Sequence, residues 1–191
     1  KLTTGNPALQ QGYQHTLSAN FNTSDSTRTR PFFAMVMLQA EQHRIGNVTY
    51  ANSTDSVLAD GTVLPAGAQL TMPMNLDGHL AGRLLTNYTV PVAALKSNVN
   101  LSLGGSADRL PGAVNDALFF TSNTNANAGV SISTATSKQI DLRLGYTANI
   151  NTARSGLRSD LDNRYYQGRL SGKVVLNGLE GWVLENEVNY D

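Results

Sequence analysis

The stretch IDLRLGYTANIN, residues 140–151, alternates between two sets of side chains along its whole length. One set is apolar (Ile140, Leu142, Leu144, Tyr146, Ala148, Ile150), and the other is polar or small (Asp141, Arg143, Gly145, Thr147, Asn149, Asn151). Because successive side chains of a β-strand point to opposite faces, this alternation predicts a strand with one apolar and one polar face. About ten residues of a tilted strand cross the hydrocarbon core of a bilayer.

The same alternation recurs in about eight stretches, which is the pattern of a transmembrane β-barrel. The expected strands cover residues 13–22, 32–41, 69–90, 97–105, 126–132, 140–151, 167–176 and 182–190. Asn177-Gly178, between the last two, is a strong hairpin signal. We therefore expect an all-β fold in which antiparallel strands form a transmembrane β-barrel or a section of one.

The polar segments between these strands differ in length. Longer ones at 46–61, 106–124 and 152–163 alternate with shorter ones at 23–30, 91–96, 136–138 and 177–181. Outer-membrane barrels have short periplasmic turns and long extracellular loops, so the first strand is expected to run toward the periplasm. Phe119 and Phe120 fall in the second expected loop and are candidate ligand contacts. Alternatively, they anchor that loop to a neighbouring loop or to a partner lipoprotein.

Composition excludes several other classes of protein. The chain has 191 residues, a formal net charge of zero and no cysteine, so neither disulfide nor thiolate chemistry is available. The neutral charge balance argues against a nucleic-acid partner. Charged residues make up 15%, below the roughly 25% of soluble domains. No apolar run reaches the roughly 18 residues that a transmembrane helix needs.

A soluble β-sandwich also alternates, and it is the main competing fold. Three features favour the membrane barrel, the third being that the charged residues of the strands fall on the faces opposite the apolar ones. The apolar faces carry almost no charge, with His15 and Asn186 as the clearly polar exceptions. Aromatic residues stand near strand ends, where barrels have interfacial girdles (Tyr13, Phe21, Phe32, Tyr88, Trp182, Tyr190).

The charged residues of the strands fall on the opposite faces, where a wet lumen would accept them. They are Arg83, Asp141, Arg143, Arg169, Lys173, Glu185 and Glu187. Arg169 or Lys173 is expected to meet Glu185 or Glu187 across the Asn177-Gly178 hairpin. The mixed signs favour ion pairs within the wall or with a plug, and a substrate site is the alternative reading.

No catalytic or cofactor motif is present, so we expect neither an enzyme nor a cofactor protein. The three histidines, His15, His43 and His79, lack metal-ligand spacing. Asp160 and Asp162 can touch a calcium ion, but a solvated loop tip explains them as well. No G-x-S-x-G nucleophile elbow and no phosphate-cradling glycine loop occurs.

Three short motifs resemble those of outer-membrane receptors. Gly5-Asn6-Pro7-x-Leu9, followed by Tyr13, resembles the GNPxLxPE segment that precedes a descending strand in TonB-dependent receptors, with Gln11 in place of the proline. Residues 32–45 followed by MPMNLDG, residues 72–78, resemble the outer membrane β-barrel family of Bacteroidota. RLPG, residues 109–112, resembles the loop after that family's next ascending strand.

The resemblance implies a barrel of about 22 strands that is closed by a plug. Residues 1–191 would be a segment of that single barrel domain, without the plug or the TonB-contacting box. It implies an outer-membrane importer of an unidentified nutrient, set in the lipid bilayer, with TonB and a surface lipoprotein as partners. Alternatives are a non-transporting scaffold or surface-assembly barrel, and a complete eight-stranded barrel. Alternation that continues to Asp191 leads us to expect unpaired edges at the first and last strands.

Leu144→Arg tests the assignment of faces. In a membrane wall, an arginine near the bilayer midplane should lower the free energy of unfolding by about 2–4 kcal/mol. The measurement is urea unfolding of the protein in phospholipid vesicles. Thr147→Arg, on the polar face of the same stretch, is the control and should lose much less. Equal losses in the two variants would contradict the assignment.

Overall fold

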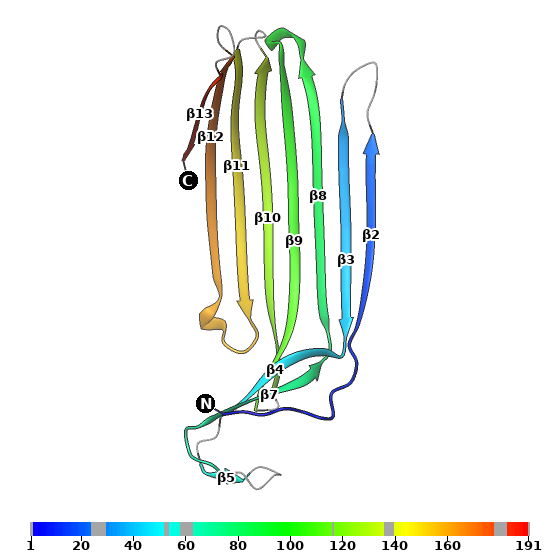
Figure 1. Ribbon diagram of the computed structural model, residues 1–191, viewed down its shortest axis with the longest axis vertical. Coiled ribbons are helices and arrows are strands. Elements are labelled where there is room, and N and C mark those ends of the chain that lie inside the picture. The colour runs from blue at the N-terminus through cyan, green and yellow to red at the C-terminus, as the bar shows by residue number, and fades with distance from the viewer. Residues whose placement is uncertain are drawn as a thin grey trace.

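A computed structural model describes residues 2–23, 30–51, 54–57, 63–115, 117–135, 140–177 and 183–190. The expected all-β class is confirmed: long antiparallel strands lie side by side in one layer (Figure 1). In spatial order they are β2 (Tyr13–Thr23), β3 (Phe32–Gln42), β8 (His79–Val92), β9 (Ser97–Val114), β10 (Ala117–Ala135), β11 (Ile140–Ser155), β12 (Asn163–Asn177) and β13 (Val183–Tyr190). Two single turns of 3₁₀ helix, η1 (Ala93–Leu95) and η2 (Ser159–Leu161), interrupt the connections. Within the described ranges, no helix is long and apolar enough to span a membrane.

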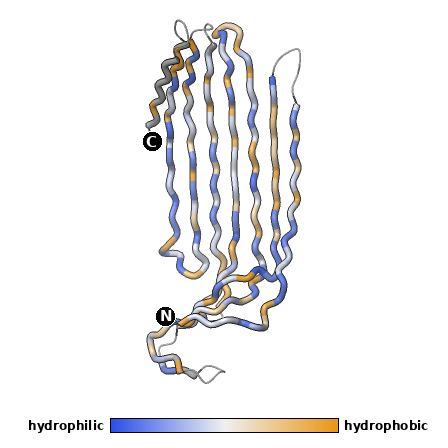
Figure 2. The backbone as a smooth tube through the Cα atoms, in the orientation of Figure 1, coloured by the Kyte–Doolittle hydropathy of each residue, from blue (hydrophilic) through white to orange (hydrophobic). Residues whose placement is uncertain are grey.

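Cross-strand register keeps the apolar set of every long strand on one face. One row of directly opposed residues runs Ala19, Val36, Leu84, Gly105, Ala126, Ile150 and Tyr166, from β2 to β12. The neighbouring row on the other face includes Asn20, Met35, Leu85, Gly104, Asn127, Asn149 and Gln167. We call these the apolar face and the polar face. Figure 2 shows the resulting alternation of hydropathy along the strands.

Exposure to solvent is inverted relative to a water-soluble fold. On β10, the apolar-face residues Val130 and Ile132 are 42% and 38% exposed, whereas the polar-face residues Asn127 and Ser131 are half-buried. Leu144, at the centre of β11, is 52% exposed. Among the described residues, no second sheet packs on the apolar face, so the core of a β-sandwich is not found.

The buried apolar core lies outside the long strands. Among the described residues, the buried hydrophobic side chains are Val48, Leu70 and Leu76. They belong to the hairpin of β4 (Arg44–Ala51) and β7 (Gln69–Leu76), which crosses beneath one end of the long strands (Figure 1). We call this hairpin and the strand β1 (Leu2–Thr3), which pairs in parallel with β7, the end platform. A two-stranded ribbon of β5 (Ser56–Val57) and β6 (Val63–Leu64) extends from it.

Several expectations about the connections are wrong, and one of them is the loop expected at 46–61, whose first residues belong to β4. The single strand expected over residues 69–90 is broken into β7 and β8 at Gly78, whose φ of +92° favours glycine. The loop expected at 106–124 is instead the continuation of β9 and β10, which pair with each other over Ser97–Val114 and Ala117–Thr134. Residues 106–109 and 121–124 are mainly polar on both faces, and residues 110–120 are mainly apolar on both, so no alternation marked these strand ends. β11 likewise extends to Ser155, inside the loop expected at 152–163.

The sheet has two open edges. β2 pairs with β3 alone and β13 with β12 alone within the described residues, as the sequence predicted. A closed eight-stranded barrel would need pairing between β2 and β13, which the described residues do not show. The expected turn at 136–138, Gly178 of the hairpin and Trp182 lie outside the described residues.

Gly78→Ala tests how the break between β7 and β8 is built. A Cβ at Gly78 would lie 3.0 Å from the ring of Phe120, whereas one at Gly67, also at positive φ (+77°), would meet nothing within 4 Å. Both variants place an L-residue in a left-handed conformation at a cost of about 1–2 kcal/mol. Urea unfolding should show a larger loss of stability for Gly78→Ala than for the control Gly67→Ala. A loss no larger than the control's would remove the packing role of Gly78 against Phe120.

Candidate functional site

The polar face is the candidate functional surface, and amide side chains line its centre. Asn125 Nδ2 donates to Asn151 Oδ1 at 2.6 Å, and Asn127 Nδ2 donates to Asn125 Oδ1 at 3.1 Å. On the β8 side, Asn100 Nδ2 donates to Thr89 Oγ1 at 3.3 Å. These short polar side chains satisfy one another across strands, so the face offers both donors and acceptors to water or to a polar solute.

Register brings part of the expected charge cluster together at one edge of the sheet. Arg143 on β11 lies opposite Lys173 on β12, which lies opposite Glu187 on β13. Asp141 and Glu185 occupy the next position along β11 and β13, each opposite Val175. The side chains of Glu185 and Glu187 lie outside the described structure, so only their register positions are given. Two cations with acidic positions on their flanks form a mixed-charge row.

The other two expected cations lie elsewhere. Arg169 faces Thr147 in register and is opposite neither Glu185 nor Glu187, so of the two pairings expected across the hairpin only that of Lys173 has the right register. Arg83 lies on β8 between Met37 and Ser106 and is exposed. It is separated from the mixed-charge row by β9 and β10. The expected residues thus form one row, with Arg169 and Arg83 at positions outside it.

A second polar cluster, which the sequence did not reveal, joins the sheet to the end platform. His79 on β8 is 5% exposed and lies between two carboxylates: its Nδ1 is 2.8 Å from Glu41 Oε2 and its Nε2 is 3.3 Å from Asp108 Oδ2. Arg44, at the start of β4, donates to the same Glu41 oxygen at 3.1 Å. We call these four residues the His79 network. It connects β3, β8 and β9 to the first residue of β4 in the platform.

The backbone around the His79 network is tied by further side-chain bonds. His43 N–H donates to Asp77 Oδ1 at 2.7 Å, and Asn75 Nδ2 donates to the His43 carbonyl at 2.7 Å and to that of Gln10 at 2.9 Å. These bonds hold the left-handed turn at His43, whose φ is +51°. The sequence missed the network because Asp108 fell in an expected loop and the three histidines showed no common spacing. Neither this network nor any other group of histidine, aspartate or glutamate side chains in the described residues is arranged to hold a metal ion.

In the loop after β11, both acidic residues, Asp160 and Asp162, accept hydrogen bonds from neighbouring groups of the chain. Arg158 donates to Asp160 at 2.6 and 3.2 Å, and this pairing lowers the pKa of the fully exposed Asp160 carboxyl. Asp162 Oδ1 accepts from Ser155 N–H at 2.8 Å. Both carboxylates that were weighed as calcium ligands therefore have protein partners here.

Phe119 and Phe120 lie on β10, so their assignment to a loop is wrong. Phe119 is opposite Gly112 on the polar face, where the absence of a side chain leaves room for its ring. Phe120 is on the apolar face, and the Arg109 guanidinium carbon lies 3.7 Å from its ring centroid. Their contacts are with neighbouring strands, and neither stands free in a loop.

No family model matches this chain, and neither curated proteins nor solved structures include a match to it. The quoted motifs nonetheless gather at one end of the sheet. Asn6 Nδ2, in the Gly5-Asn6-Pro7 motif, donates to the Pro73 carbonyl of the second motif at 3.0 Å. Arg109 of the third motif lies opposite Leu80, two residues after the second motif ends. Segments far apart in sequence thus meet around the end platform.

His79→Leu tests whether the His79 network holds the platform to the sheet. The variant removes the ring nitrogens that lie 2.8 Å from Glu41 and 3.3 Å from Asp108, and we expect a loss of about 1–3 kcal/mol in stability. Amide hydrogen exchange across β4 and β7 should accelerate. His15→Leu, an exposed apolar-face position, is the control and should leave that exchange unchanged. Unaltered exchange in His79→Leu would mean that the buried apolar contacts alone hold the platform.

Proposed function

We propose that this chain is a section of the wall of a bacterial outer-membrane β-barrel, and that the barrel imports a nutrient as TonB-dependent receptors do. The main support for a membrane location is that apolar side chains on one face of the sheet are exposed, whereas polar side chains on the other face are half-buried. Exposed leucine, valine and isoleucine side chains on one face are 36–68% exposed, and water would make that arrangement costly at roughly 25 cal/mol for each Å². Lipid removes the cost.

The open edges support a wall made of more strands than these. Backbone N–H and C=O groups of β2 and β13 face away from their single partners, and hydrocarbon offers them no hydrogen bonds. Further strands that pair with both edges would close the ring. A larger barrel fits this requirement better than a complete eight-stranded one.

The end platform supports the orientation. Residues 43–78 between β3 and β8 form the longest connection of the described sheet, and long connections in outer-membrane barrels are extracellular. The platform end would then face outside, and β2 would run toward the periplasm. Residues 106–124 give no support to this orientation, because they belong to the strands β9 and β10 and do not form a long loop.

The polar face supports a wet interior. Asparagine, serine and threonine side chains of β9, β10 and β11 are half-buried there and bond across strands, as expected for a surface that lines water. The mixed-charge row has a second reading, in which Arg143, Lys173 and Glu187 bind only each other within the wall. That reading favours the second candidate function, a scaffold or surface-assembly barrel that transports nothing.

Solute uptake separates importer from scaffold. Cells that lack the full-length protein, cells that carry it, and cells with Arg143→Gln/Lys173→Gln are grown in one defined medium, and solute depletion is followed by mass spectrometry. An importer predicts that at least one solute is depleted more slowly without the protein, and that the double variant slows the same solute at equal barrel abundance. Arg158→Gln, in an exposed loop, is the control. Identical depletion in all strains would favour the scaffold.

A further inference from the structure

The apolar face ends in a basic border on the side of the platform. Arg109, Arg154 and Arg164 lie on this face by register, and all three are exposed. Arg109 and Arg154 are both directly opposite Ser122, one on each side of β10. Strands are about 4.8 Å apart, so the two arginines are separated by about 10 Å of backbone. Arg164 lies opposite Thr152, two residues from Arg154 and one strand further along.

No acidic residue balances this border. The apolar-face positions of the described strands include no aspartate or glutamate, and neither Arg154 nor Arg164 has an ion-pair partner among the described residues. Asp108 adjoins Arg109 in sequence but lies on the polar face, against His79. The Arg109 guanidinium stacks on Phe120, an arrangement that holds the charge in place and leaves its N–H donors unused by carboxylates.

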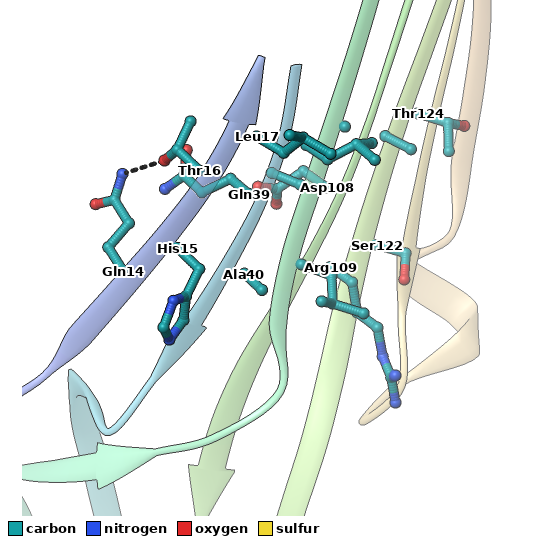
Figure 3. A pocket seen from close by; sticks show the side chains of 15 residues that line it. Gln14, His15, Thr16, Leu17, Gln39, Ala40, Asp108, Arg109, Ser122 and Thr124 are labelled. Atoms are coloured by element: carbon teal, nitrogen blue, oxygen red, sulfur yellow. Dashed lines mark hydrogen bonds between the residues drawn. The ribbon is translucent and has the colours of Figure 1, made fainter. Parts of the chain in front are cut away.

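An apolar depression begins at this border. It has a volume of about 860 Å³ and is walled by Leu17, Leu38 and Leu80, with Gly82 and Ala107 between them. Its polar lining comprises Gln14, His15, Thr16, Gln39, Asp108, Arg109, Ser122 and Thr124, of which Asp108 belongs to the polar face by register. Figure 3 shows Arg109 and Ser122 on the side of the sheet toward which Leu17 points. Gly82, Ala107 and Thr124 follow one another in register, so a run of small side chains lowers the surface there.

We propose that this face binds one molecule of an anionic phospholipid, with its headgroup phosphate on Arg109, Ser122 and Arg154 and an acyl chain in the depression. The inference rests on the membrane wall proposed above. A charged head beside an apolar tail matches the basic border beside the apolar depression. Guanidinium groups recognise phosphate oxygens through paired N–H donors, and the Ser122 hydroxyl supplies a third donor between them. The depression lies within the range of volumes typical of ligand sites.

Lipid retention tests this site. The full-length protein is extracted from membranes in mild detergent and exchanged with phosphatidylglycerol or with phosphatidylcholine of the same acyl chains, and bound lipid is counted by native mass spectrometry. We expect a preference for phosphatidylglycerol. An interfacial arginine contributes about fivefold to the affinity for anionic lipid. Arg154→Gln should therefore weaken retention about fivefold, and Arg109→Gln/Arg154→Gln about 25-fold. Arg158→Gln removes the same charge four residues away and should change nothing.

The other outcomes identify which proposal fails. Equal retention of both lipids, or equal losses in Arg154→Gln and Arg158→Gln, would overturn the lipid site while the protein remains in the membrane fraction. Displacement of phosphatidylglycerol by inorganic phosphate alone would assign the site to free phosphate and overturn the acyl-chain part. Recovery of the protein in the soluble fraction would overturn both the lipid site and the membrane wall.

Discussion

Cross-strand register is the constraint on which the rest of this structure depends. Side chains alternate with a period of two, so a slip of one residue between any two strands would exchange their faces. Seven successive antiparallel pairings from β2 to β13 keep the apolar sets in common, as the alignment of Leu17 with Leu38 and of Val130 with Tyr146 illustrates. Neither face is covered by a second layer of the described residues. Because the two faces differ in polarity and both are uncovered, they favour different environments, an apolar one on one side of the sheet and a polar one on the other.

The sequence was informative wherever one face was apolar. The alternation of residues 140–151 placed β11 correctly, and the strands expected at 13–22 and 32–41 agree closely with β2 and β3. It failed where both faces became polar, because period two then leaves no hydropathy signal. The continuation of β9 through residues 106–109 and of β10 through residues 121–124 was missed for this reason, and Asp108 with it. Residues 110–120, which are mainly apolar on both faces, show no alternation either, and this concealed Phe120. Long-range side-chain contacts, such as that of His79 with Glu41, depend on register and were not predictable.

The end platform and the long strands are stabilised by different interactions. The platform is small but has the buried apolar core of a water-soluble fold, with Val48 fully buried, and side-chain bonds of Asn6 and Asn75 fasten the N-terminal segment to it. The long strands rely on backbone pairing and, in our proposal, on lipid. The His79 network lies where the end platform joins the long strands, close to the basic border of the apolar face. This end of the molecule therefore combines the polar face, the basic border of the apolar face and the platform.

The most direct test of the membrane wall compares two neighbouring residues of β10 that differ only in face. The chain contains no cysteine, so Val130→Cys and Ser131→Cys introduce single thiols into it. In membranes that contain the full-length protein, a water-soluble, membrane-impermeant maleimide should modify S131C and leave V130C unreacted. Val130 is exposed and Ser131 half-buried when lipid is absent, so an apolar face in water would give the reverse order. Faster modification of V130C would contradict the account.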